Sequence, residues 1–155
     1  MREELIKQEI EQRFSETRVV VPRKQRIIVS LHKDSVFSLV AYMKEAGFRH
    51  LSFITCVDWI NEDEFELVYH LASYGDGIHA MVKTRIDRSD PTYLSLIPLF
   101  ENARTYEREI HEMFGVRFVG NDRLIPFLLT NWHEMPPMKK DFDTEAYAER
   151  MFEHE

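Results

Sequence analysis

The fold is decided between Glu64 and Asp87, where the chain reads EFELVYHLASYGDGIHAMVKTRID. Residues 64–73 and 78–87 both alternate between apolar and polar side chains, the pattern of strands with one buried face. That face carries Phe65, Leu67, Tyr69 and Leu71 in the first segment and Ile78, Ala80, Val82, Thr84 and Ile86 in the second. The linker Tyr74-Gly75-Asp76-Gly77 is short and turn-rich, so the two segments are predicted to form an antiparallel hairpin.

Further strands are predicted upstream of this hairpin. Residues 50–60 are almost continuously apolar, and the short linker 61–63 joins them to the hairpin as another antiparallel pair. Residues 25–31 are rich in β-branched side chains, which is typical of a strand, and residues 18–22 form a brief strand or an extended link. We therefore expect a mainly antiparallel sheet of about four strands.

Helical patterns surround the strands. Residues 3–14 place apolar side chains at helical spacing, and a second helix is predicted between a cap at Asp34 or Ser35 and a stop at Gly47. Asp90-Pro91 combines a cap with a first-turn proline, which predicts another helix start. This order of elements predicts an α+β fold in which helices pack on one face of the sheet.

The most regular helix is predicted from Ala103 to Phe114, ending at Gly115. Its apolar stripe consists of Ala103, Tyr106, Ile110, Met113 and Phe114. Another face carries the charged residues Arg104, Glu107, Arg108, His111 and Glu112. These charges form either a solvated face, with i,i+4 pairs contributing about 0.2–0.5 kcal/mol each, or an interface where arginine forks meet a partner's carboxylates.

Regular patterning stops after Gly120. The following segment, residues 121–142, contains three prolines but also Leu124, Ile125, Phe127, Leu128, Leu129 and Trp132. So many large apolar groups must lie on a surface, either that of the chain's own core or that of a partner. We predict one α+β domain over residues 1–120 and an extended, partner-wrapping tail over residues 121–155, with room for a short charged helix from Thr144.

Composition narrows the classes of function. The chain has 155 residues, a net charge of −7 and a single cysteine, Cys56. No long basic stripe is present, so a nucleic-acid partner is not expected. Apolar runs fall far short of the roughly 20 residues that cross a bilayer, and the acidic N-terminus does not resemble a signal peptide. One thiol excludes a disulfide within the chain and a four-thiolate iron–sulfur cluster, and its apolar neighbours predict an inert, buried group.

Motifs of catalysis and metal binding are not found in the sequence. The clustered glycines Gly75 and Gly77 belong to a hairpin turn and not to a phosphate-binding loop, and no HExxH, CxxC or Gly-x-Ser-x-Gly pattern occurs. His70 and His79 can approach each other across the hairpin, but such pairs are usually plain surface residues. We therefore predict no catalytic, cofactor-binding or metal-binding residue.

The predicted helix and the segment after it resemble a known family. Residues 106–116, YEREIHEMFGV, followed by Phe118 and Gly120, are similar to the signature of the 30 kDa subunit family of respiratory complex I. Relatives of that family occur in membrane-bound nickel–iron hydrogenases and similar ion-pumping complexes. The later block 137–142, PMKKDF, resembles the closing block of the family.

Residues upstream extend this resemblance, and three features depart from it. Val57-Asp58-Trp59 and residues 65–71 match the family's central hairpin, so the resemblance covers about residues 25–142. Glu112 replaces the usual aspartate, residues 121–124 lack the usual His-Pro and basic pair, and the sequence ends soon after residue 142. These departures favour the shorter subunits of energy-converting hydrogenases and their relatives, with a true NADH- or F420H2:quinone oxidoreductase as the alternative.

The resemblance implies an accessory role without chemistry of its own. It predicts a peripheral subunit on the cytoplasmic side of the cell membrane, bound to the membrane only through the complex. The expected partners are the large catalytic subunit, 49 kDa-like or of the hydrogenase type, and nearby iron–sulfur subunits. Iron–sulfur clusters, and nickel–iron in a hydrogenase, are expected on those partners and no cofactor on this chain.

The predicted partner interface combines the charged helix, its exit and the tail. Its residues are Arg104, Glu107, Arg108, Glu109, Glu112, Phe114, Gly115, Gly120, Leu124, Phe127, Trp132, Lys139, Lys140, Asp141 and Phe142. Two rival hypotheses come from other classes of protein. One is a free-standing enzyme with a carboxylate–histidine site at Glu107 and His111, and the other is a soluble module that binds a peptide or a helix with the same surface.

Overall fold

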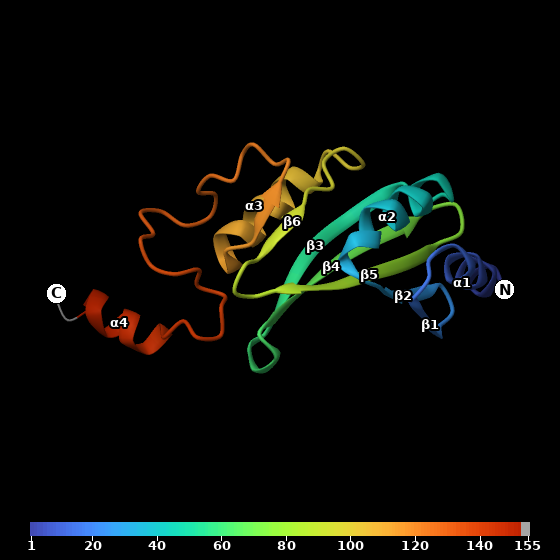
Figure 1. Ribbon diagram of the computed structural model, residues 1–155. Helices are drawn as coiled ribbons and strands as arrows, with labels where there is room; N and C mark the ends of the chain where they lie inside the picture. Colours follow the sequence, from blue (N-terminus) through green and yellow to red (C-terminus); the bar gives the residue numbers. More distant parts are fainter. Residues whose placement is uncertain (153–155) are drawn as a thin grey trace.

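The computed structural model describes residues 1–152, which build a mixed α/β molecule around a five-stranded sheet (Figure 1). The helices are α1 (Arg2–Arg13), α2 (Val36–Glu45), α3 (Ala103–Phe114) and α4 (Thr144–Phe152), with short 3-10 turns at Lys33–Ser35 and Ile60–Glu62. The sheet strands are β1 (Arg18–Arg23), β2 (Arg26–Ser30), β3 (His50–Trp59), β4 (Glu64–Ser73) and β5 (Ile78–Asp87). Strands β6 (Thr92–Leu94) and β7 (Arg117–Val119) form a separate parallel pair.

The sheet has the strand order β1-β2-β5-β4-β3. The predicted hairpin is confirmed, since β4 and β5 pair antiparallel with Leu71 opposite Ala80. The sheet differs from the prediction in having a fifth strand, β1, and one parallel pair, in which Ile28 of β2 lies opposite Met81 of β5. Parallel partners are joined by long connections, so nothing in the local sequence of β2 indicates this pairing.

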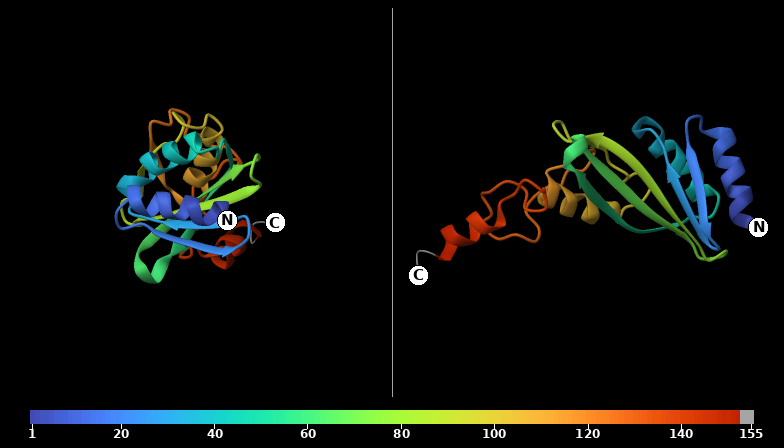
Figure 2. Two further views of the ribbon diagram at one scale, coloured as in Figure 1. Left: turned by 90° about the vertical axis from the view of Figure 1, so that its right-hand side faces the viewer. Right: turned by 90° about the horizontal axis from the view of Figure 1, so that it is seen from below.

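The helices α1, α2 and α3 bury their apolar faces against the inward residues of the sheet in one core, which confirms the predicted α+β layering. Ile10 of α1, Leu39 of α2 and Ile110 of α3 are buried in that core with Tyr69 and Val82 of the sheet. In Figure 1, α2 and α3 lie above the sheet, and the left view of Figure 2 shows these layers end-on.

The predicted helix start at Asp90-Pro91 is wrong. The side chain of Thr92 donates to Asp90 Oδ1, and the Pro91 carbonyl accepts from the backbone N–H of Arg117 at 2.7 Å. The residues that follow therefore form β6, because pairing with β7 satisfies their backbone groups and buries Tyr93. Long-range pairing overrides the local capping signal here.

The tail begins after β7 and reaches away from the body of the molecule. Between Gly120 and Asp143 the chain forms neither helix nor strand, and α4 then lies beyond the end of the sheet (Figures 1 and 2). The predicted helix from Thr144 is confirmed as far as Phe152, and its last three residues lie outside the described part of the chain.

Candidate functional site

The predicted interface centres on α3, which is held firmly on the edge strand of the sheet. Tyr106 donates its hydroxyl to the Ser52 carbonyl at 2.7 Å, and Ile110 is buried in the core. At the end of α3 the rings of Phe114 and Phe65 meet edge-on, with centroids 5.9 Å apart. The face of α3 that points away from the sheet is therefore presented to the tail in a fixed orientation.

Glu107 is the buried charge of this region. Its carboxylate accepts hydrogen bonds from the Leu96 amide and the Ser95 hydroxyl at 2.8 Å and from Asn121 Nδ2 at 2.9 Å. Burial raises the pKa of Glu107, and the three hydrogen bonds oppose that effect. The side chain has no exposed surface, so Glu107 can influence a partner only through the segments that it holds.

Arg104 and Arg108, predicted to meet a partner, bind the chain's own tail. Arg104 forms ion pairs with Glu101 and with Asp122 of the tail. Arg108 donates from Nε to the Ile125 carbonyl at 2.8 Å and from Nη2 to the Pro126 carbonyl. A planar guanidinium that grips two consecutive carbonyls fixes both the position and the direction of the backbone.

Glu112 completes this grip on the tail. Its carboxylate accepts the backbone N–H groups of Phe127, Leu128 and Leu129 at 3.1, 2.8 and 3.0 Å, while the Arg108 guanidinium lies 4.7 Å from the Phe127 ring centroid. Burial alone raises the pKa of Glu112, but the three N–H donors and the charge of Arg108 together lower it. We call Arg104, Glu107, Arg108 and Glu112 the helix anchor.

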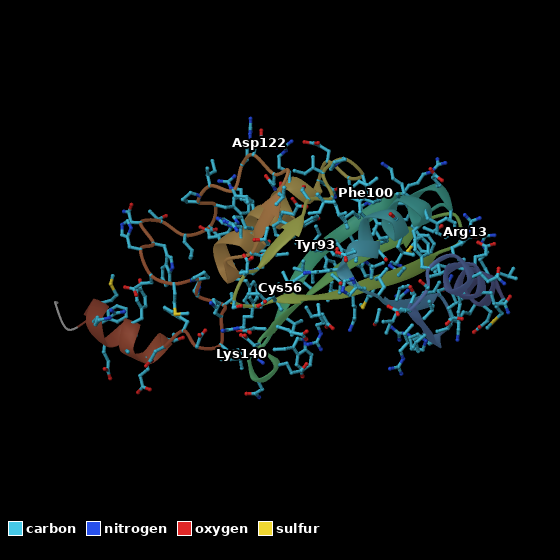
Figure 3. All side chains as sticks on the ribbon, viewed as in Figure 1. Arg13, Cys56, Tyr93, Phe100, Asp122 and Lys140 are labelled. Carbon is cyan, nitrogen blue, oxygen red and sulfur yellow. The ribbon has the colours of Figure 1, made fainter. Side chains whose placement is uncertain are left out.

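A second anchor holds the far end of the tail, and it was not predicted. Buried Asp58, at the end of β3, accepts Arg88 Nε at 2.8 Å and Nη2 at 3.1 Å, and also the Lys140 backbone N–H at 2.8 Å. Arg88 reaches on to Asp141 Oδ1 at 2.7 Å. We call Asp58, Arg88 and Asp141 the strand anchor. In the view of Figure 3, Asp122 lies at the top of the molecule and Lys140 near its lower edge.

The strand anchor has the electrostatics of a tight ion pair. Burial by itself raises the pKa of Asp58, but the hydrogen bonds from Arg88 and Lys140 and the charge of Arg88 outweigh it and lower the pKa. Hydrogen bonds to Asp58 and Asp141 raise the pKa of Arg88. Asp58 and Arg88 are thus both charged at neutral pH. Because the bidentate pair fixes Asp58, the hydrogen bond from the Lys140 amide to Asp58 restrains the tail at Lys140.

Aromatic contacts order the middle and end of the tail. The ring of Trp132 lies 5.5 Å from that of Phe142 and 5.0 Å from that of Tyr147 in α4. The Met138 amide donates to the Met113 carbonyl at 2.9 Å, at the end of α3. The tail therefore packs partly on itself and partly on the exit of α3.

The looped tail leaves a hollow beside α3 and exposes much of its apolar surface. A cavity of about 450 Å³ opens there, lined by His111, Glu112, Leu124, Ile125, Pro126, Leu129, Asn131, Trp132 and His133. Side chains that stay exposed on the tail are Ile125 (56%), Phe127 (41%), Leu128 (55%), Met135 (37%) and Met138 (56%). Within residues 1–152 nothing covers them, so this apolar surface is free in the isolated chain.

The other predicted interface residues take several positions. Glu109 and the backbone of Gly120 are exposed, Lys139 is half-buried, and the Lys140 side chain is exposed although its amide is held by Asp58. Gly115 and Gly120 have φ values of 81° and 99°, which favour glycine, and they turn the chain out of α3 and β7. Whether these residues touch a partner stays a prediction.

Asp58 and Arg88 were missed as a functional pair. Asp58 follows Ile54 and Cys56 at the period of two that marks the buried face of β3, so a signal did exist. A carboxylate on such a face needs a cation to pair with it. The cation that pairs with Asp58 is Arg88, which follows β5, and a further hydrogen-bond donor is the Lys140 amide of the tail. Local spacing in the sequence cannot reveal contacts between residues so far apart.

No arrangement typical of an active site is found among residues 1–152. Glu107 and His111 form no hydrogen bond with each other there, since His111 Nδ1 lies 2.8 Å from the Val116 carbonyl oxygen. Burial raises the pKa of the Cys56 thiol and keeps it protonated. The described residues contain no cluster of three or more histidine, cysteine or acidic side chains suited to a metal ion. None of their helices has the length and apolar content for crossing a membrane.

Comparisons with known proteins agree on one family. The family model of the respiratory-chain NADH dehydrogenase 30 Kd subunit matches residues 29–148. A component of the F(420)H(2) dehydrogenase of Methanosarcina mazei is 34% identical over 124 residues, covering 76% of each chain. A component of the NADH-quinone oxidoreductase of Moorella thermoacetica is 34% identical over 70% of this chain and 74% of the relative. The chain spans only 42% of the 30.4 kDa mitochondrial subunit of Neurospora crassa, to which it is 36% identical.

Solved structures share the fold. A chain of the membrane-bound sulfane sulfur reductase, an archaeal respiratory membrane complex, superposes with a TM-score of 0.92 and 35% identity, covering 99% of this chain and 92% of that chain. A trypsin-resistant fragment of Nqo5 gives a TM-score of 0.68 at 25% identity, covering 83% of this chain and all of the fragment. The chain therefore belongs to the family of the 30 kDa subunit of respiratory-chain NADH dehydrogenase.

Proposed function

We propose that this chain is a non-catalytic accessory subunit in the cytoplasmic arm of a membrane-bound oxidoreductase related to complex I. Its role is to brace the large catalytic subunit, and the tail is the surface that does so. The observation that carries this proposal is the exposed apolar surface of the tail, held at both ends by anchors that belong to the rigid body. A segment fixed so firmly, yet uncovered, is suited to binding with little loss of entropy.

The charged residues support a structural role. Arg108 and Glu112 direct their hydrogen bonds to the tail backbone, Arg104 pairs with Glu101 and Asp122, and Glu107 is enclosed. These groups are consumed in positioning the tail, which leaves few polar groups there for chemistry. In this proposal, electron transfer and its coupling to ion translocation take place on other subunits, which hold the iron–sulfur clusters.

The similarity to one solved chain includes the tail. The chain from the archaeal sulfane sulfur reductase matches 99% of this chain and 92% of its own length. This similarity supports a place in a short-chain complex related to that reductase. A place in an energy-converting hydrogenase and a place in an F420H2- or NADH-linked quinone reductase are the competing forms of the proposal.

The test replaces exposed apolar side chains of the tail by charge. Ile125→Asp with Leu128→Asp should leave the domain folded but greatly reduce co-purification of the large subunit, by about tenfold or more, because interface residues of this kind cost about 2 kcal/mol. Leu5→Asp is the matched control, because Leu5 is also 56% exposed but lies on α1. Wild-type yield of the large subunit with the double variant would disprove the proposed interface.

A further inference from the structure

The face of the sheet turned away from the helices carries an apolar row whose side chains are exposed or half-buried in the described residues 1–152. Strand register places Val20, Ile28, Met81, His70 and Phe53 side by side, one from each of the five strands. Val20 and Phe53 are 38% and 37% exposed, and the Phe53 ring stacks on His70 with centroids 4.8 Å apart. Burial and the neighbouring His79 and Arg26 lower the pKa of His70, so this row is uncharged at neutral pH. We call these residues the open row.

The rows on either side of the open row carry positive charge and no acid. One flanking row is Arg18, Ser30, Lys83, Val68 and Thr55, and the other is Arg23, Arg26, His79, Ala72 and His50. Arg18, Arg23 and Arg26 form no ion pair within residues 1–152, and Lys83 reaches Glu66 of the next row only at 3.9 Å. In a chain with net charge −7, an acid-free band of this width is a distinct local feature.

The band is also hollowed. A cavity of about 200 Å³ opens where Pro22, Arg23, Arg26, Ile27, Ile28, His70, His79 and Met81 meet. His70 and His79 lie with ring centroids 5.2 Å apart, and the Nδ1 atom of each is buried without a hydrogen-bond partner. A pocket with an apolar floor and a cationic rim fits an aliphatic side chain whose neighbours carry carboxylates.

We propose that the open row is a second docking surface, separate from the tail, and that it binds an acidic amphipathic helix of another protein. The apolar stripe of that helix lies along the open row, with one side chain in the hollow. Its flanking aspartates and glutamates meet Arg18 and Lys83 on one side and Arg23 and Arg26 on the other. A helix lying on a sheet face repeats the packing that α2 makes on the opposite face.

The positive charge beside the open row favours an acidic helix over a basic one. A basic helix would place like charges against the arginines, which costs affinity. The tail lies at the other end of the molecule in Figure 2, at the α3 side, so the same chain can hold both partners at once. The chain would then bridge two proteins instead of capping one.

The experiment introduces a photocrosslinker into the full chain within its affinity-purified complex. A benzoyl-phenylalanine in place of Phe53 tests the open row, and the same group in place of Leu5, exposed on α1, is the matched control. The expected adduct joins Phe53 to a helical segment of another polypeptide whose apolar stripe is flanked by acids, with about tenfold more product than at Leu5. An adduct with a second copy of this chain, with lipid or with a basic segment, or none above the Leu5 level, overturns the inference.

Charge variants then test the complementarity. Arg26→Glu with Lys83→Glu should lower the yield of the Phe53 adduct about tenfold, whereas Arg26→Lys with Lys83→Arg should preserve it. Thermal melting of each variant confirms that the chain is folded. Equal yields from the two pairs of variants contradict the proposal. If the other subunits still co-purify but Phe53 gives no adduct, the open row is refuted while the role of the tail stands.

Discussion

At the scale of single residues, charged side chains of α3 bind the backbone of the chain's own tail. Arg108 donates hydrogen bonds to two carbonyls and Glu112 accepts them from three amides, so side chains that the sequence assigns to a solvated or partner-binding stripe make contacts within the chain. The sequence places Arg104, Arg108 and Glu112 on one face at helical spacing. It does not say what faces them, because the tail returns from 15 or more residues away.

Glu107 makes the first prediction at this scale. Glu107→Ala leaves the Leu96 amide, the Ser95 hydroxyl and the Asn121 amide buried without their acceptor, and should cost about 3 kcal/mol or more of unfolding free energy. Glu107→Gln keeps an acceptor and the shape, and should recover much of that loss. Urea unfolding of the three proteins measures the difference, and equal stability of the alanine variant and wild type would refute the role given to this carboxylate.

Asp58 makes a prediction about pH. Its native pKa lies below the ordinary value of 3.8, so the ion pair contributes its full stability above that pH and loses it as the pH falls through the lower native pKa. Asp58→Asn should therefore cost about 3 kcal/mol at pH 7, and the gap to wild type should shrink as the pH falls below 3.8.

Unfolding at several pH values checks the Asp58 prediction. Asp63→Asn is the control, since Asp63 is an exposed turn residue with a φ of 54° that asparagine also adopts readily. Its stability should stay within about 0.5 kcal/mol of wild type at every pH. A gap between Asp58→Asn and wild type that stays constant down to the lowest pH would show that the carboxylate charge is not the cause.

At the scale of elements, the fold could be predicted wherever neighbours in sequence are neighbours in space. The hairpin of β4 and β5 and the helix α3 have the predicted bounds, because period-two and helical patterns are local signals. The parallel pairing of β2 with β5 and the β6–β7 pair could not be predicted, since both depend on distant partners. Dependence on distant partners also explains why the helix predicted from Asp90-Pro91 is wrong and why the strand anchor could not be predicted.

Gly115 tests how the exit from α3 sets the path of the tail. Its φ is 81°, and an added Cβ would lie 3.1 Å from Pro136 Cγ. Gly115→Ala should therefore cost about 1–2 kcal/mol and loosen the tail around Pro136. Gly75→Ala is the control, because that turn glycine has no atom within 4 Å of an added Cβ. Thermal unfolding compares them, and equal melting temperatures of the two variants would contradict this account.

At the scale of the whole molecule, the looped tail extends from a rigid body of sheet and helices. The helix anchor and the strand anchor fix the tail at residues 121–129 and 140–141, and its apolar side chains remain uncovered within residues 1–152. Family membership and the 0.92 TM-score to a chain of an archaeal respiratory membrane complex agree with such a design. The central claim is that a partner covers the exposed apolar side chains of the tail in the assembled complex.

Methionine oxidation measures most directly whether a partner covers the tail. Met135 and Met138 of the tail are 37% and 56% exposed, and Met1, 77% exposed on the far side of the molecule, serves as the internal reference. Peroxide footprinting followed by mass spectrometry compares the isolated chain with the purified complex. The account predicts that oxidation of Met135 and Met138 slows about tenfold in the complex while Met1 is unchanged. Equal oxidation of the tail methionines in the two samples would contradict it.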